Sequence, residues 1–210
     1  MEVDSGYPVQ LDIDYPDGPR NRLTVAFRIF TVIPILILAA TIGGGTFTAG
    51  QAGGSGATFA AAGGALFLGP LLMILFRRKY PRWWFDWNLQ LTRFTTRVGA
   101  YAGLLRDEYP ATDDDQAVHL EIKYPDVPYE LKNWMPLVKW FLAIPHYIVL
   151  VFLWLAVIVV TIIAWFAILF TGKYPRGMFA FVVGVQRWTV RVEAYAFLLT
   201  TDRYPPFSLQ

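Results

Sequence analysis

The sequence contains no cysteine and only two histidines among its 210 residues. Without cysteine, disulfides, thiolate metal sites and cysteine nucleophiles are excluded. Charged residues make up only 16% of the chain, whereas globular proteins carry about 25%. The net charge of +2 is too small, and no basic run is long enough, to indicate a nucleic-acid-binding protein. These shortages leave few side chains that could perform chemistry.

Charge is also missing from two long stretches of the chain. Asp, Glu, Lys and Arg are absent from Ile29 to Phe76 and again from Trp140 to Gly172. The whole sequence is 55% hydrophobic, and long uncharged apolar segments are typical of membrane proteins. The N-terminal MEVDSGYPVQLDID has no basic segment before an apolar one, so we expect no cleaved signal peptide.

The tetrapeptide KYPR occurs twice, with Tyr80 and Tyr174 at equivalent positions 94 residues apart. The self-match extends well beyond KYPR, and VQLDIDYPD (9–17) also resembles VHLEIKYPD (118–126). Further aligned pairs are Arg28 with Lys139, Pro34 with Pro145, Phe85 with Phe179, Arg93 with Arg187, Arg97 with Arg191, Tyr101 with Tyr195 and, after one added residue, Asp107 with Asp202. We therefore predict two tandem repeats, 1–110 and 117–210, joined by an acidic linker at 111–116.

The predicted fold class is a mainly α membrane protein with about four transmembrane segments. Each repeat is expected to hold a short β-strand, a transmembrane helical hairpin and an amphipathic interfacial helix. The first repeat has a strand at 8–15, transmembrane segments at 24–42 and 59–76 around a Gly-rich tip at 43–58, and an amphipathic helix at 83–106. The second has a strand at 117–124, transmembrane segments at 134–152 and 154–171, and an amphipathic helix at 178–201.

The second apolar stretch allows two interpretations. As one helix it would be about 50 Å long at 1.5 Å per residue, too long for a ~30 Å hydrocarbon core without strong tilt. The likeness to the first repeat favours a hairpin that turns near Leu153 to Leu155, although no Gly or Pro marks a turn there. The alternative is an interfacial helix from Leu131 to Ala143, kinked at Pro145, that leads into one spanning helix.

The segments outside the apolar stretches have clear periodicities. VQLDIDY and VHLEIKY alternate apolar and polar residues, so the two strands could pair into a ribbon. Each amphipathic helix has apolar residues at spacings of four and three, with two arginines four residues apart beside the stripe. Either these helices lie on the inner leaflet with arginine at lipid phosphates, or they pack on protein. The headgroup and interface candidates are Arg82, Arg93, Arg97, Arg176, Arg187, Arg191, Tyr80 and Tyr174.

Basic residues gather near the ends of the predicted membrane helices, and the hairpin tips carry none. The positive-inside rule then predicts a multi-pass protein of the bacterial inner (cytoplasmic) membrane with both termini in the cytoplasm. Arg28 and Lys139 lie just inside the apolar segments, and we expect them to snorkel toward the interface.

His146 is the intramembrane polar candidate, because it follows Pro145 within an apolar run where the first repeat has Ile35. Alternatively, a neutral His146 simply bonds to a carbonyl freed by the proline or to a headgroup. No carboxylate lies within either apolar stretch, and no catalytic set, metal site or cofactor motif is recognisable. We therefore expect a protein that is not an enzyme and needs no cofactor.

The segments KWFLAIPHYIVL, AWFAILFTGKYPRGMFAF and GVQRWTVRVEAYAFLLTTDRYPPFSL resemble a bacterial integral-membrane family catalogued as a domain of unknown function. The resemblance covers nearly all of 117–210 and, more loosely, 7–110. The first repeat departs from it by the Gly-rich insertion and by Trp83-Trp84 where Gly177-Met178 stands in the second. The resemblance implies a membrane protein present as two copies of one unit, and it implies no catalytic residues.

The sequence therefore predicts a non-catalytic accessory or scaffolding subunit of a membrane complex. Its partners would be membrane lipids and another membrane protein or a second copy of itself, and not nucleic acid. The alternative is a lipid or small-solute transporter, or a lipid-handling membrane protein, since repeats with Gly-rich membrane segments are frequent in transporters.

Overall fold

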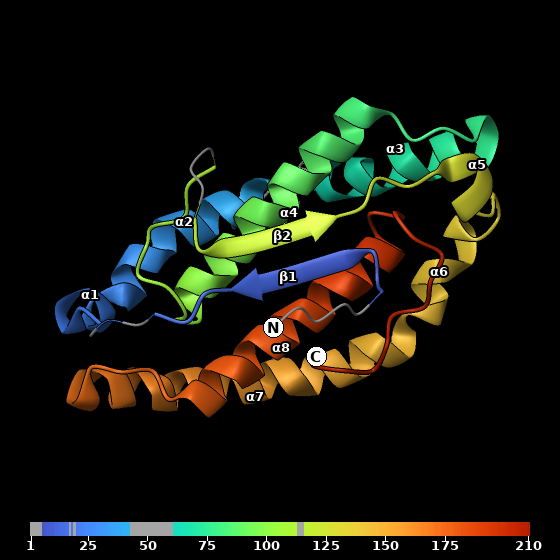
Figure 1. Cartoon of the computed structure of the whole chain (residues 1–210). Coiled ribbons are helices and arrows are strands. Elements are labelled where there is room, and N and C mark those ends of the chain that lie inside the picture. The colour runs from blue at the N-terminus through green and yellow to red at the C-terminus, as the bar shows by residue number, and fades with distance from the viewer. Residues whose placement is uncertain (1–5, 17, 19, 43–60, 113–115) are drawn as a thin grey trace, which may run out of the picture.

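A computed structural model of the chain describes residues 6–16, 18, 20–42, 61–112 and 116–210. The predicted Gly-rich tip at 43–58 and the centre of the acidic linker lie outside the described residues. The described chain is mostly helical (Figure 1). Its elements are β1 (Val9–Ile13), α1 (Arg22–Ala26), α2 (Arg28–Ile42), α3 (Ala61–Arg77), α4 (Arg82–Ala102), β2 (Val118–Ile122), α5 (Val127–Glu130), α6 (Pro136–Leu142), α7 (Ile144–Thr171) and α8 (Arg176–Ala196).

The two predicted strands form an antiparallel ribbon, which confirms that prediction. Leu11 of β1 stands opposite Leu120 of β2 at the centre of the register, and Figure 1 shows the two arrows side by side. Both strands have the same alternating burial, with the odd positions of β1 and the even positions of β2 turned inward. An isolated ribbon is marginally stable. This one is stabilised by α4, which packs against β2, and by α8, which packs against β1.

Helix α4 lies between the ribbon and α2. Its Arg93 donates from Nε to the carbonyl oxygen of Leu120 in β2 at 3.0 Å. Its Phe94 and Val98 are buried against Ile35 of α2. Around the helix axis, Phe94 and Val98 lie about 100° and about 140° from Arg93, so these contacts use different sides of α4.

Helix α8 has the same position in the other half of the molecule. Its Arg187 donates to the carbonyl oxygen of Leu11 in β1 at 2.9 Å. Its Trp188 donates to His146 of α7 at 3.1 Å. The molecule thus has three layers: the ribbon, then α4 with α8, then α2 and α7 on the side away from the ribbon.

The two amphipathic helices occur where the periodicity predicts them, but each ends earlier than expected. Helix α4 ends at Ala102 and α8 at Ala196, instead of at 106 and 201. Leu104 and Leu199 have φ angles of 61° and 57°, so the chain leaves the helical conformation in the left-handed region just after each helix. Pro81 and Pro175 of the KYPR segments are extended N-cap residues. The prolines therefore precede these helices, as their fixed φ allows.

The predicted hairpin in the second apolar stretch is wrong. Residues Ile144–Thr171 form one helix of 28 residues, with no turn near Leu153 to Leu155. Pro145 lies in the first turn of this helix, where proline is tolerated, and no Gly or Pro follows it before Gly172. A continuous helix also satisfies every interior backbone N–H and C=O. Gly172, with φ of 73°, ends it in the left-handed conformation. Transmembrane segments at 134–152 and 154–171 are thus replaced by a short α6 and a long α7.

The first apolar stretch also differs from the predicted hairpin. Segment 24–42 is divided at Phe27 into α1 and α2, and segment 59–76 corresponds to α3. Helix α2 packs on α4, whereas α3 packs on α6. The described parts of α2 and α3 therefore do not pack along each other as the two arms of a hairpin would.

One helix of the described chain, α7, is long and apolar enough to cross a membrane, and α2 is a shorter apolar helix. Four transmembrane segments are therefore not supported. Residues exposed on α7 recur along its whole length, while its buried residues form a single stripe: His146, Leu150, Val157, Ala164 and Ile168. This stripe faces the rest of the protein.

Candidate functional site: buried charge clusters and the α7–α8 groove

A fully buried lysine is the most unusual side chain of the second half. Lys139 of α6 is 0% exposed, and its Nζ lies 2.7 Å from a carboxylate oxygen of Asp202. The same ammonium donates to the carbonyl oxygen of Thr201 at 2.7 Å and lies 5.3 Å from the centre of the Tyr195 ring. A buried charge is tolerated only when it is paired and hydrogen-bonded. This cluster ties α6 to the segment that follows α8.

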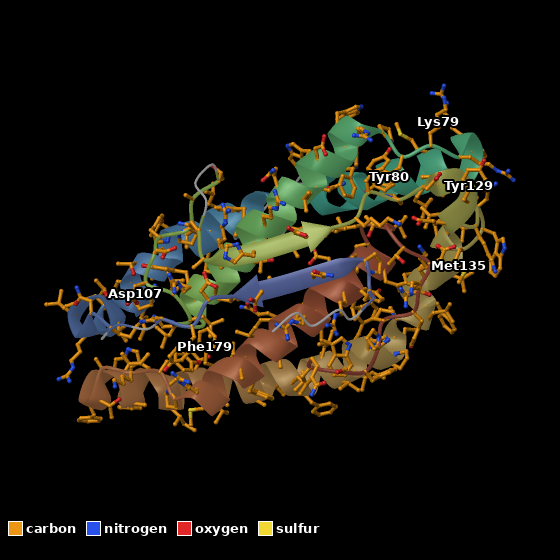
Figure 2. The ribbon with its side chains drawn as sticks, in the orientation of Figure 1. Lys79, Tyr80, Asp107, Tyr129, Met135 and Phe179 are labelled. Carbon is orange, nitrogen blue, oxygen red and sulfur yellow. The ribbon has the colours of Figure 1, made fainter. Side chains whose placement is uncertain are left out.

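The first half contains a corresponding cluster around Asp107. Arg28 of α2 is 3% exposed, pairs with Asp107 and lies 3.8 Å over the ring of Tyr101. Arg20 also pairs with Asp107, at 2.8 Å, and donates to the carbonyl oxygen of Leu105 at 2.7 Å. In Figure 2, Asp107 is labelled at the end of the molecule where α1 and α2 meet.

The prediction that Arg28 and Lys139 snorkel to the interface is therefore wrong. Both point into the protein, because a carboxylate from beyond the apolar stretches reaches each of them. These carboxylates, which the apolar stretches themselves lack, are Asp107 and Asp202, and they follow the amphipathic helices. The alignment of the two halves contained a signal for them, since the cations, the tyrosines and the carboxylates occupy equivalent positions.

Tyr80 lies inside the protein rather than at a lipid interface. It is 3% exposed, donates from its hydroxyl to the carbonyl oxygen of Leu198 at 2.9 Å, and accepts a bond on its own carbonyl from the Tyr124 hydroxyl. Burial raises the pKa of the Tyr80 hydroxyl. Figure 2 shows Lys79 projecting away from the molecule while Tyr80 beside it points inward.

Tyr174 has an equivalent environment in the second half. It is 1% exposed, and its hydroxyl donates to the carbonyl oxygen of Gly103 at 3.4 Å. Its own carbonyl accepts from the Tyr15 hydroxyl at 2.5 Å. Burial raises the pKa of Tyr174 to about 12. Each KYPR tyrosine thus joins its own half of the chain to the other half.

The arginines of the two KYPR segments are on the surface. Arg82 and Arg176 are exposed. Their guanidinium groups lie over the rings of Tyr124 and Tyr15, at 5.0 and 5.2 Å from the ring centres. Their predicted contact with lipid headgroups stays a prediction.

The four arginines of the amphipathic helices bond to protein. Arg93 and Arg187 donate to the ribbon, as described above. Arg97 donates to the carbonyl oxygen of Ala111 at 2.8 Å, and Arg191 donates to that of Ser208 at 3.4 Å. Of the two interpretations of these helices, the contacts fit packing on protein rather than arginine at lipid phosphates.

His146 is 0% exposed and belongs to an aromatic cluster. The Trp188 indole N–H donates to its Nδ1 at 3.1 Å, and the Phe207 ring stacks on it with centres 4.0 Å apart. Because the indole is only a donor, Nδ1 must accept, which places the proton of a neutral ring on Nε2. The expected bond to a carbonyl or headgroup is replaced by this indole bond. The first half has Ile35 and Phe94 in the equivalent places.

A groove of about 550 Å³ runs between α7 and α8. Its walls are mostly apolar side chains, among them Trp154, whose indole donates to Thr189 at 3.1 Å. Glu193 brings the one carboxyl group to this lining, and burial raises its pKa from 4.5 to about 7. The Tyr147 hydroxyl is buried at the same groove without a hydrogen-bond partner in the described chain. Sequence reasoning did not single out either residue.

These groups do not form a reactive set. The described residues contain no group of three or more His, Asp or Glu that could hold a metal ion. The clusters around Asp107 and Asp202 bring charges together but leave no nucleophile beside a base. What the arrangement can do is hold segments together and, at the α7–α8 groove, accept an apolar molecule with a polar end.

Residues 133–208 match the model of a family described as a domain of unknown function (DUF4389). The match covers α6, α7, α8 and most of the C-terminal segment. No curated protein and no solved structure matches the chain at a significant level. About the last third of the chain is therefore similar to a family of unknown function.

Proposed function

We propose that this protein is a non-catalytic membrane protein of the bacterial inner membrane that serves as an accessory or scaffolding subunit of a membrane complex. The observation that carries the proposal is the exposed apolar surface of α7 and α2. Monomeric soluble proteins rarely expose large continuous apolar patches. The exposed residues include Ile29, Phe30, Ile33, Val151, Phe152, Leu155, Ile158, Val159, Ile162, Ile163, Phe166 and Phe170.

The role of the interior polar groups supports a structural task. The paired charges at Asp107 and Asp202, and the inward arginines of α4 and α8, each bind one segment of the chain to another. Such contacts stabilise a fixed shape and leave the outer surfaces to meet other molecules. A scaffold needs this combination.

The chain is proposed to be two tandem copies of one unit. This is supported by matched contacts in addition to the sequence: the cation, tyrosine and carboxylate clusters, the tyrosine bonds at the KYPR segments, and the arginine bonds from α4 and α8 to the ribbon. The charge clusters lie within each half, whereas the tyrosine bonds, the arginine bonds to the ribbon and the strand pairing all join one half to the other. A single half would therefore lack part of its core.

Both termini and the ribbon are proposed to face the cytoplasm. Exposed basic residues adjoin the ends of the apolar helices on both halves, namely Arg77, Arg78, Lys79, Arg82, Lys132, Lys173 and Arg176. Basic residues near membrane segments favour the cytoplasmic side.

The scaffolding role is tested by extracting the full chain from bacterial membranes in polymer-bounded lipid discs and weighing the particles by native mass spectrometry. We expect one fixed stoichiometry, either with a partner protein or with a second copy. A clean monomer, after extraction from the organism's own membranes, contradicts the proposal. An alkaline carbonate wash, which removes proteins held only by charge, tests the membrane association separately: the chain should stay in the pellet.

A lipid-handling function is the second candidate, and the α7–α8 groove favours it. The groove is apolar with a carboxyl group and a free hydroxyl at its wall, which suits a lipid chain with a polar head. Reconstituted protein should then speed exchange of a fluorescent phospholipid between vesicles, and Glu193→Gln should alter the pH dependence of that exchange. Equal exchange with and without protein contradicts this candidate.

A further inference from the structure

Helix α7 and the ribbon occupy the same length of the molecule. Trp154, near the middle of α7, bonds to Thr189 of α8 at 3.1 Å. Two residues earlier on α8, Arg187 bonds to Leu11 at the centre of β1 at 2.9 Å. Measured along the axis of α7, the centre of the ribbon therefore lies close to the middle of that helix.

The outer face of the ribbon is charged and exposed. The side chains of Asp12, Asp14 and His119 are 75%, 57% and 59% exposed. Glu121 and Lys123 are exposed on the same strand pair. If α7 crossed a bilayer with its midpoint at the bilayer centre, these groups would stand at the same depth. Charged side chains at that depth are costly unless they face the interior of a bundle or a water-filled cavity.

The apolar helices and this charged face are on opposite sides of the α4–α8 layer. Helix α4 packs on both β2 and α2, and α8 packs on both β1 and α7, so these two helices separate the ribbon from the apolar helices. Figure 1 shows α7 running lengthwise along the molecule, roughly following α8 and the ribbon. The molecule therefore has one polar, charged face and one apolar face. A membrane-spanning protein would instead have polar surface at both ends and an apolar belt between them.

The charges and aromatic residues around α7 agree with this division. Lys132 precedes α6 and Lys173 follows α7, so basic residues flank this apolar segment at both ends. A helix that crosses a bilayer would bring one of these two ends to the far side, against the positive-inside tendency. Trp134 and Trp140, on the segment that enters α7, are 57% and 52% exposed. Exposed tryptophan is enriched at the membrane–water boundary.

We propose that α7 lies parallel to the membrane plane, embedded with α2 in the cytoplasmic leaflet only, while the ribbon faces water. The partner of the apolar face is thus a lipid monolayer, and the basic residues at the helix ends meet its anionic headgroups. From the proposed function, this inference takes only the association with the membrane. It differs in that α7 inserts into one leaflet and does not cross the bilayer.

Single cysteines provide a clean test, because the chain has none of its own. Tyr129→Cys lies before α6, at a residue that is 89% exposed and is labelled in Figure 2. Lys173→Cys lies just beyond α7, and Asp12→Cys on the ribbon is the control for the polar, charged face. The full-length variants are treated with a membrane-impermeant maleimide in inside-out and in right-side-out vesicles. We expect all three to react at least tenfold more in inside-out vesicles. Opposite preferences for Tyr129→Cys and Lys173→Cys would overturn the inference.

Depth measurements separate in-plane insertion from a hairpin that also keeps both ends on one side. Ile148, Leu155 and Phe166 are half exposed and point the same way on α7, since they are seven and eleven residues apart. Spin labels at these sites should show similar ratios of oxygen to nickel-chelate collision, within about twofold. A ratio that rises strongly at Leu155 relative to both other sites overturns the inference. A chain recovered in the soluble fraction contradicts the proposed function as well, so the two failures are distinguishable.

Discussion

Replacing Asp202 by asparagine removes the only carboxylate that contacts the buried Lys139 within the described chain. The ammonium group is 0% exposed and 2.7 Å from the carboxylate, so it cannot regain water without moving α6. Breaking a buried pair by removing one partner costs about 3–5 kcal/mol. Asparagine keeps an oxygen that can accept from the Lys132 amide, which now bonds to Asp202 at 2.7 Å. The expected loss therefore reports the uncompensated charge.

Replacing the other partner of the pair, Lys139, should lower the free energy of unfolding by less. Lys139→Met removes the charge but keeps the volume, and the carboxylate left behind is 14% exposed and keeps its bond to the Lys132 amide. We expect a loss of about 1–3 kcal/mol, partly from the unpaired carbonyl of Thr201. The double variant Lys139→Met/Asp202→Asn should be more stable than Asp202→Asn alone, because paired apolar or neutral replacement is often tolerated.

The assay is thermal or denaturant unfolding of the full chain in mild detergent, followed by tryptophan fluorescence, with a double-mutant cycle to extract the coupling. Asp14→Asn on the exposed ribbon face is the matched control and should change the free energy of unfolding by less than about 0.5 kcal/mol. Additive effects with no coupling between Lys139 and Asp202, or an Asp202→Asn loss as small as the control, would refute the reasoning.

Three further predictions concern single features of the second half. Glu193 has a folded-state pKa raised from 4.5 to about 7, so unfolding releases its proton within this window and stability should fall as the pH rises through it; Glu193→Gln should remove a fall of about 1–3 kcal/mol between pH 4.5 and 7.5, and an unchanged pH profile would count against the burial of this carboxyl. His146→Ile and Trp188→Phe should each destabilise, whereas the double variant, which restores the apolar pair of the first half, should lose at least about 1 kcal/mol less than the sum. Gly184→Ala should cost about 1–3 kcal/mol in the melting assay, since an added Cβ would lie 2.8 Å from a carbonyl oxygen of the C-terminal segment. Gly177→Ala, with nothing within 4 Å, is its control and should be neutral or slightly stabilising.

The short-period elements of the fold were predictable because their signals are local. Alternation at 9–13 and 118–122 marks strands, and the near identity of the two segments pointed to their pairing. Apolar spacings of four and three mark α4 and α8. The ends of these helices were less predictable, because Leu104 and Leu199 adopt a left-handed conformation that leucine rarely takes.

The apolar helices were harder to predict because length and hydropathy do not determine the direction in which a helix runs. An uncharged stretch too long for one simple crossing was interpreted as a hairpin, since the first half has a Gly-rich insertion in the same region. In the structure, α7 continues as one helix because a stripe of its residues, from His146 to Ile168, packs on the rest of the protein over almost its whole length. A helix held in this way need not fit the thickness of a bilayer.

At the candidate site, too, the sequence indicated individual residues but not the residues that they contact. The arginines of α4 and α8 were identified, and so was His146, but their partners were not. Each partner comes from a distant part of the chain, as with Leu120 for Arg93 and Leu11 for Arg187. Glu193 and Tyr147 meet at one groove only because α7 and α8 pack antiparallel.

By itself, the sequence determined the apolar character of the chain, the internal match between its halves, and the local structure of the ribbon and of α4 and α8. These properties follow from periodicity and composition, which act over a few residues. Only the tertiary structure decided that Arg28 and Lys139 turn inward, that α7 is one helix, and that the charged ribbon and the apolar helices lie on opposite faces. Those outcomes depend on which distant groups meet. A buried charge must lie beside a partner of opposite charge, and the hydrophobicity of the sequence does not indicate which residue that partner is.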